Sequence, residues 1–231
     1  MTHVDPAGDV GDLVVAVDGP SGSGKSSTAR GVAVRLGLRY LDTGAMYRAL
    51  TWWMLEHGVD VDDPAAVAAA APRVRLEVGT DPTAPTIAVD GVDVAAPIRG
   101  PEVTAAVSSV SAVPAVRALL VDRQRDVIGA GGIVVEGRDI GSVVAPEADL
   151  KVYLVADAAA RAVRRAAEQG GDVADATLTE AELARRDRLD STRAASPLRR
   201  APDAVVVDGT SASLDDVVER VCSLAFGARH A

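Results

Sequence analysis

A short apolar run followed by a glycine-rich turn occupies the segment Leu13-Val14-Val15-Ala16-Val17-Asp18-Gly19-Pro20-Ser21-Gly22-Ser23-Gly24-Lys25-Ser26. The apolar residues indicate a strand that is buried on both faces, as in a parallel sheet. The turn from Gly19 to Ser26 matches the pattern G-x-x-x-x-G-K-[ST] in full. Apolar residues at helical spacing follow the turn, namely Ala29, Val32, Ala33 and Leu36. A strand before the turn and a helix after it are the context that a phosphate-binding loop requires.

The chemistry of such a loop explains its residue types. Glycines allow backbone N–H groups to turn inward around phosphate oxygens, and the helix that begins near Lys25 directs its dipole at the same anion. We expect Lys25 to reach the β- and γ-phosphates of ATP and Ser26 to bind Mg²⁺. The alternative is a chance glycine turn. The predicted ATP-binding residues are Gly19, Pro20, Ser21, Gly22, Ser23, Gly24, Lys25, Ser26 and Ser27.

Further apolar runs indicate how the rest of the sheet is built. Short runs recur at 38–41, 133–135, 150–155 and 204–207, and helical patterns lie between them, including 116–127 and 217–224. Strands that alternate with helices indicate a parallel sheet covered on both faces. The sequence therefore predicts an α/β protein with a doubly wound, five-stranded parallel sheet as its core.

Two excursions interrupt this pattern. Residues 42–132 separate the second run from the third, whereas a simple crossover needs only about 10–12 residues. Strand patterns at 74–78, 86–89 and 92–94 lie within this gap, with a hairpin turn at Asp90-Gly91. We therefore predict a small β-rich insertion at 73–100, a core made of 13–72 and 101–231, and a helical lid at about 157–200. A merely solvated helical hairpin is the alternative for the lid.

Composition excludes several classes of protein. The formal net charge is −9, which repels nucleic acid and anionic membranes over long range. Cys222 is the single cysteine, so neither an internal disulfide nor a cysteine-based zinc site is possible. The chain contains no asparagine, which removes the Asn-Lys-x-Asp element that GTPases use to read guanine. The absence of a secretory signal and of a run of about 20 apolar residues favours a cytoplasmic protein, and a monomer is expected.

Two segments supply candidate groups for an acceptor ligand. Thr43 is the predicted N-cap of a helix, so its hydroxyl could hold an anion, and Arg48 follows just over one turn later. Arg138 and Asp139 follow the strand at 133–135 in a glycine turn, at the sheet edge where ligands bind in open α/β sheets. The alternatives are an ordinary cap with a solvated arginine, and a surface ion pair of little energetic value.

A third candidate lies in the arginine-rich segment of the lid. Arg186, Asp190 and Arg193 are spaced at i, i+4 and i+7, which places them on one helix face. Two guanidinium groups beside a carboxylate suit a triphosphate and a ribose hydroxyl. A solvated face of i,i+4 salt bridges is the alternative, and on this segment alone it is the better fit.

Taken together and in this order, these motifs resemble bacterial cytidylate kinases. The resemblance runs from about residue 13 to 226 and rests on the phosphate loop, Leu41-Asp42-Thr43-Gly44-Ala45-Met46-Tyr47-Arg48, Glu136-Gly137-Arg138-Asp139-Ile140-Gly141 and Arg186-Asp187-Arg188-Leu189-Asp190-Ser191-Thr192-Arg193. Residues 103–125 also resemble the segment that follows the insertion in that family. Two residues depart mildly from the family pattern: Thr43 stands where serine often occurs, and Ser26 stands where some members have glycine. The middle of the lid matches least, which leaves roles for Arg161, Arg164 and Arg165 open.

The resemblance implies a core, an NMP-binding insertion and a lid, with CMP and dCMP as acceptors and ATP with Mg²⁺ as donor. It implies that Ser108, Arg117 and Asp139 contact cytosine, that Arg48, Arg138 and Arg193 hold the acceptor phosphate, and that Arg186 and Asp190 contact the sugar. Thr43 completes the predicted CMP-binding set, and the predicted catalytic residues are Lys25, Arg138, Arg186 and Arg193. A carboxylate at Asp139 accepts from the cytosine amino group but opposes the uracil oxygen. We therefore expect cytosine to be favoured over uracil by at least tenfold to a hundredfold.

The expected reaction is direct in-line transfer, because an ionised acceptor phosphate needs no strong general base. Three alternatives stay open at this level. Another small-molecule kinase, such as an adenylate or shikimate kinase, shares the loop but should lack the later motifs. A nucleotide-binding ATPase or regulator would need no acceptor. A nucleic-acid-binding module is disfavoured by the net charge and by an aromatic content of 3%.

Overall fold

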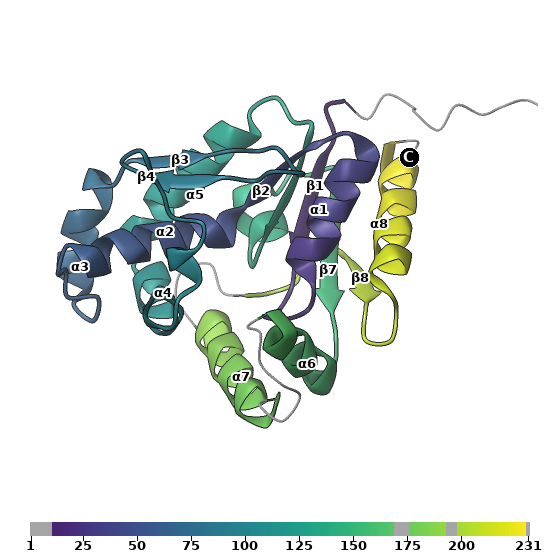
Figure 1. Cartoon of the computed structure of the whole chain (residues 1–231). Helices are drawn as coiled ribbons and strands as arrows, with labels where there is room; N and C mark the ends of the chain where they lie inside the picture. Colours follow the sequence, from purple (N-terminus) through teal and green to yellow (C-terminus); the bar gives the residue numbers. More distant parts are fainter. Residues whose placement is uncertain (1–10, 169–175, 193–197, 230–231) are drawn as a thin grey trace, which may run out of the picture.

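The core of the protein is a five-stranded parallel sheet (Figure 1). The structure is a computed structural model and describes residues 11–168, 176–192 and 198–229. The strand order is β2-β6-β1-β7-β8, and the predicted doubly wound sheet is confirmed. The strands are β1 (Val14–Asp18), β2 (Arg39–Asp42), β6 (Ile133–Gly137), β7 (Leu150–Val155) and β8 (Val205–Asp208).

Helices cover both faces of this sheet. α1 (Lys25–Leu36) and α8 (Leu214–Arg229) pack on one face, and α2 (Thr43–Glu56), α4 (Pro101–Ala112) and α5 (Pro114–Ile128) pack on the other. Val15 and Val17 belong to the core cluster under α1 and α8, whereas Ala16 between them belongs to the cluster under α2, α4 and α5, because successive strand residues point to opposite faces. The short helices are α3 (Pro64–Ala70), the 3-10 helices η1 (Ala71–Arg73) and η2 (Pro97–Arg99), and the π-helix η3 (Ile140–Val144).

The register of the sheet brings three strand ends to one edge. β1 pairs in parallel with β6 so that Asp18 lies beside Gly137, and β2 pairs with β6 so that Asp42 lies beside Glu136. The loops that follow these strands therefore begin next to one another, although they come from distant parts of the chain. This edge is where ligands bind in open α/β sheets.

The predicted insertion is a three-stranded antiparallel sheet of β3 (Leu76–Val78), β4 (Ile87–Val89) and β5 (Val92–Asp93). The predicted hairpin is confirmed, because Asp90 and Gly91 both have positive φ, of 51° and 80°. The apolar residues Ile87, Val89 and Val94 belong to the same core cluster as α2. The insertion thus extends one of the two main cores.

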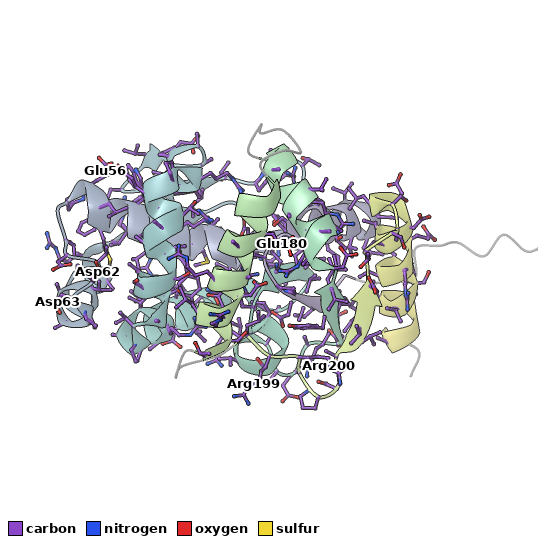
Figure 2. All side chains as sticks on the ribbon, turned by 90° about the horizontal axis from the view of Figure 1, so that it is seen from below. Glu56, Asp62, Asp63, Glu180, Arg199 and Arg200 are labelled. Atoms are coloured by element: carbon purple, nitrogen blue, oxygen red, sulfur yellow. The ribbon has the colours of Figure 1, made fainter. Side chains whose placement is uncertain are left out.

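Two helices, α6 (Ala158–Glu168) and α7 (Ala176–Thr192), lie within the predicted lid. They pack against each other at the end of the sheet toward which β7 and β8 point (Figure 1). Seen from below, α7 lies between α4 and α6 (Figure 2). Among the described residues, no individual helix combines the length and apolar character of a membrane span; α4 and α5 meet those criteria only when taken together, across a bend of 95°.

Candidate active site

The phosphate loop has the backbone that its sequence predicts. Gly24 is the N-cap of α1 and lies in the left-handed region with φ 90°, and no side-chain hydrogen bond caps the start of the helix. Gly19 approaches β7 so closely that a Cβ there would lie 2.2 Å from the Leu154 carbonyl oxygen. Ser23 Oγ is buried and has no hydrogen-bond partner among the described residues. A buried hydroxyl at an open helix N-terminus fits a phosphate ligand.

Cations surround this loop from three elements. One belongs to α1, one follows β6, and two belong to α6, and each donates to a different carbonyl oxygen of the loop. The bonds are Lys25 Nζ to Pro20 O at 2.8 Å, Arg138 Nη1 to Gly19 O at 2.8 Å, Arg161 Nη1 to Ser21 O at 3.0 Å and Arg164 Nη1 to Ser23 O at 3.3 Å. The lid arginines whose roles the sequence left open therefore include two that contact the loop directly.

A buried carboxyl group, that of Glu136, lies beside the phosphate loop. Glu136, at the end of β6, accepts hydrogen bonds from the Tyr40 hydroxyl at 2.5 Å and from the Ser26 side chain. Burial raises the pKa of Glu136, the nearby Asp42 carboxylate raises it further, and Lys25 opposes both effects. Sequence reasoning assigned Glu136 no role, although it lies inside a quoted motif. Its signal is its position as a charged residue at the end of a buried strand.

A second buried carboxyl group anchors the turn that carries Arg138 and Asp139. Asp18 accepts from the backbone N–H groups of Ile140 and Gly141, both at 2.8 Å. Burial raises the pKa of Asp18 to about 6 despite these two bonds. The loop after β1 and the loop after β6 are thereby tied together. Sequence reasoning also missed this residue.

Arg138 links the core to the lid. Its Nε donates to Asp190 Oδ2 of α7 at 2.8 Å, while its Nη1 bonds the phosphate loop. Two predicted site residues from segments 52 positions apart are thus brought together. Arg186 lies on α7, but its side chain is outside the described residues, and Arg193 lies outside them altogether.

Of the three residues predicted to read the base, Arg117 and Asp139 are in direct contact. Arg117 of α5 forms a buried ion pair with Asp139, and its guanidinium lies 5.3 Å from the centroid of the Tyr47 ring. Arg117 Nε is buried without a hydrogen-bond partner among the described residues. Ser108 lies on α4, partly exposed, and its carbonyl accepts from the Ser111 hydroxyl.

The prediction that Thr43 is an N-cap is wrong. β2 ends at Asp42, which has extended dihedral angles and accepts from the Ala45 N–H at 2.9 Å, so Asp42 caps α2. Thr43 is the first helical residue, and its hydroxyl donates to the Glu136 carbonyl at 2.6 Å. Arg48 is buried and donates to the Ile98 carbonyl and to Thr104 Oγ1. It therefore connects α2 to the segment that leaves the insertion.

A parallel sheet with a phosphate-binding loop, surrounded by cations from the core and from a helical lid, defines a P-loop kinase. A family model described as cytidylate kinase matches residues 15–226. The chain belongs to the cytidylate kinase family, which confirms the resemblance seen in its motifs.

Relatives support this membership over nearly the whole chain. A cytidylate kinase from Streptomyces avermitilis is 55% identical over 214 residues, covering 92% of each chain. One from Streptomyces coelicolor is 58% identical over 214 residues, again covering 92% of each. Among solved structures, an uncharacterized protein from Eubacterium ventriosum is similar at a TM-score of 0.50 and 10% identity, covering 94% of this chain and 99% of that one. That likeness concerns the fold alone.

Proposed function

We propose that the chain transfers the γ-phosphoryl group of ATP to CMP and dCMP, forming CDP and dCDP. Membership of the cytidylate kinase family supports this activity and its place in pyrimidine nucleotide metabolism. The observation that carries the proposal is the set of four cations, Lys25, Arg138, Arg161 and Arg164, bonded to one phosphate loop. Because the protein has a net charge of −9, the clustering of four cationic side chains at this edge of the sheet favours a ligand with several negative charges.

The chemistry follows from positioning and charge neutralisation. The acceptor phosphate is ionised near neutral pH and attacks the γ-phosphorus directly, with the β-phosphate of ATP as leaving group. Lys25 and the loop N–H groups would hold the donor. Arg138, which bonds both the phosphate loop and Asp190 of α7, would hold the acceptor phosphate. Arg48, Thr43, Arg186 and Arg193 remain predicted contacts of the acceptor.

Mg²⁺ fits the oxygen donors at the start of α1. Ser26 is an exposed residue, and its hydroxyl is hydrogen-bonded to Glu136; the two are hard oxygen groups of the kind that Mg²⁺ prefers. Ser26 would hold the ion, with Glu136 orienting that hydroxyl. When bound, the ion neutralises charge on the β- and γ-phosphates. The hydrogen bond from the Tyr40 hydroxyl holds the Glu136 carboxyl group in place.

Cytosine selectivity is assigned to the buried pair Asp139 and Arg117. Asp139 would accept from the cytosine amino group, and the unpartnered Arg117 Nε would donate to a ring nitrogen or carbonyl oxygen. Uracil carries an oxygen where cytosine carries the amino group, so it would leave Asp139 facing an acceptor. An unpaired buried group costs about 1–3 kcal/mol.

The test is an acceptor panel with ATP as donor. CMP, dCMP, UMP, AMP and shikimate are each supplied, and nucleoside diphosphate, phosphorylated shikimate and free phosphate are quantified separately. We expect transfer to CMP and dCMP, with at least tenfold lower kcat/KM for UMP. Phosphate release without any acceptor would instead identify an ATPase, and preferred transfer to AMP or shikimate a different kinase.

Lys25→Ala is the first variant to compare. Removing the ammonium group should lower kcat by at least about a hundredfold, since one positioned charge or donor is worth that much in comparable sites. Thermal unfolding should show a folded protein. Near-normal turnover would contradict the assignment of the phosphate loop.

A further inference from the structure

A carboxylate of α7 touches both the phosphate loop and a lid arginine. Asp187 Oδ1 accepts from the Ser21 backbone N–H at 3.0 Å, and its Oδ2 accepts from Arg161 Nη1. The same Arg161 nitrogen donates to the Ser21 carbonyl at 3.0 Å. The two main-chain polar groups of one loop residue, Ser21, are thus bonded by α7 and α6 respectively. The proposed function gives Asp187 no part.

The two side chains are largely shielded from solvent. Asp187 and Arg161 are 17% and 14% exposed, which distinguishes this pair from a solvated ion pair on the lid surface. Burial raises the pKa of the Tyr153 hydroxyl, and the charges of Asp187, Arg138 and Arg161 also act on it. These three charged groups therefore lie near one another, close to the end of β7. Asp187 is therefore bonded to the phosphate loop through Oδ1 and to the lid helix α6 through Oδ2.

Arg161 retains one buried donor that the protein does not use. Its Nε is buried and has no hydrogen-bond partner among the described residues, whereas its Nη1 is bonded twice. A buried donor without an acceptor is unfavourable, so a ligand oxygen at this point would be stabilising. The phosphate loop makes a phosphate oxygen the matching acceptor.

We propose that Asp187 is a positioning residue for phosphoryl transfer, which fixes the Arg161 guanidinium against the Ser21 carbonyl. This inference rests on the proposed function. Asp187 occupies one nitrogen of Arg161 and leaves Nε for the transferring phosphoryl group, so Arg161 is oriented before the reaction begins. Preorganised donors are effective because they need no reorientation in the transition state. Asp187 itself touches no substrate.

The geometry also allows a competing interpretation that gives the opposite kinetics. Asp187 occupies an N–H group of the loop, and a carboxylate in that place could compete with a phosphate oxygen. An inhibitory contact of that kind predicts tighter ATP binding and equal or faster turnover when the carboxylate is removed. A positioning role predicts slower turnover with little change in ATP binding.

The experiment measures kcat and the KM for ATP at saturating CMP for the wild type, Asp187→Asn, Asp187→Glu, Arg161→Ala and the double variant Arg161→Ala with Asp187→Asn. An asparagine oxygen can satisfy Ser21 N–H or Arg161 but not both. We expect Asp187→Asn to lower kcat about a hundredfold, with KM changed less than about threefold. Asp187→Glu should restore part of the rate. The double variant should be no slower than Arg161→Ala alone, because Asp187 acts by orienting Arg161 and has nothing to orient once that arginine is removed.

Matched controls come from the same region. Glu180 is exposed on α7, and Arg200 is exposed beyond it (Figure 2), so Glu180→Gln and Arg200→Ala change the same charges without touching the loop. Both should keep kcat within about twofold of the wild type. Thermal unfolding of each variant separates loss of fold from loss of rate.

The outcomes separate this inference from the proposed function. A wild-type enzyme that phosphorylates no nucleoside monophosphate would overturn both. If the wild type is active, any of three results would overturn the positioning role alone. These are an unchanged kcat in Asp187→Asn, faster turnover with a lower KM for ATP in Asp187→Asn, or additive losses of kcat in the double variant. A lower kcat that the double variant does not deepen would support it.

Discussion

The carboxyl group of Asp18 lies between two loops of the site and titrates where most carboxyl groups are already ionised. Burial raises its pKa to about 6, against an ordinary value of 3.8. The folded state therefore holds this proton to higher pH than the unfolded state does. Asp18 thus contributes stability that is fully present below about pH 4 and is lost as the pH rises through 6.

This pH dependence can be tested with Asp18→Asn, which removes the titrating group. The difference in unfolding free energy between wild type and variant should shift by about 2 kcal/mol against the wild type between pH 4.5 and 7.5. Urea denaturation at several pH values measures it, and groups common to both proteins cancel. Parallel curves for the two proteins would show that Asp18 titrates normally.

The Arg117–Asp139 pair should govern both selectivity and stability. Asp139→Asn replaces an acceptor by an amide that can rotate to donate to uracil, so the CMP:UMP ratio of kcat/KM should fall by at least tenfold. The same change weakens the partner of a buried guanidinium and should cost on the order of 3 kcal/mol of stability. Steady-state kinetics and urea denaturation give the two values.

An exposed ion pair provides the control for this variant. Arg35 and Glu219 pair at 2.6 Å with side chains 43% and 69% exposed. Arg35→Ala should therefore cost less than about 1 kcal/mol and leave selectivity unchanged. Unchanged CMP:UMP discrimination in Asp139→Asn would mean that another residue reads the base.

At the level of elements, the sequence predicts the strands well and their mutual contacts poorly. Buried apolar runs place all five core strands within about two residues, because continuous burial leaves a local pattern. The same pattern stops β6 at Val135 and so misses Glu136, whose partners Tyr40 and Ser26 come from other elements. A hydropathy pattern does not indicate which polar side chains from different elements will form hydrogen bonds with one another.

Two failures illustrate the remaining limits. Asp42 and Thr43 are both good capping residues, and only the point where β2 ends makes Asp42 the cap. The contact of Asp187 with Ser21 joins residues 166 positions apart, so helical spacing within α7 cannot reveal it. Motifs identify the chemistry of this site, whereas the fold decides which members of each motif face the loop.

One hydrogen bond joins α2 to the insertion and can be measured as an element-level link. Trp53 Nε1 donates to Asp90 Oδ2 at 2.9 Å. Trp53→Phe keeps an aromatic ring but removes the donor, and Asp90→Gly removes the acceptor while tolerating the positive φ of the turn. A double-mutant cycle by urea denaturation should give a coupling energy of about 1 kcal/mol. Additive effects would indicate that the bond contributes nothing to stability.

At the scale of the whole molecule, the insertion depends on the core for its stability. Its three strands contain 3, 3 and 2 residues, too few to be stable alone. Ile87 and Val89 are only 5% and 1% exposed because the insertion packs on α2, in the cluster that also contains Ala16 and Val135 of the central sheet. Although 73–100 reads as a separate lobe in the sequence, it should therefore unfold together with the sheet.

Equilibrium unfolding of Trp52→Phe tests this cooperativity, because Trp53 is then the single tryptophan and contacts the insertion at Asp90. Trp53 fluorescence and far-ultraviolet circular dichroism should give coincident urea transitions, as expected for one cooperative unit. Asp90→Gly in the same background should move both transitions to lower urea by the same amount, since loosening the hairpin weakens the shared core. A fluorescence transition that precedes the loss of helix signal would show that the insertion melts first, on its own.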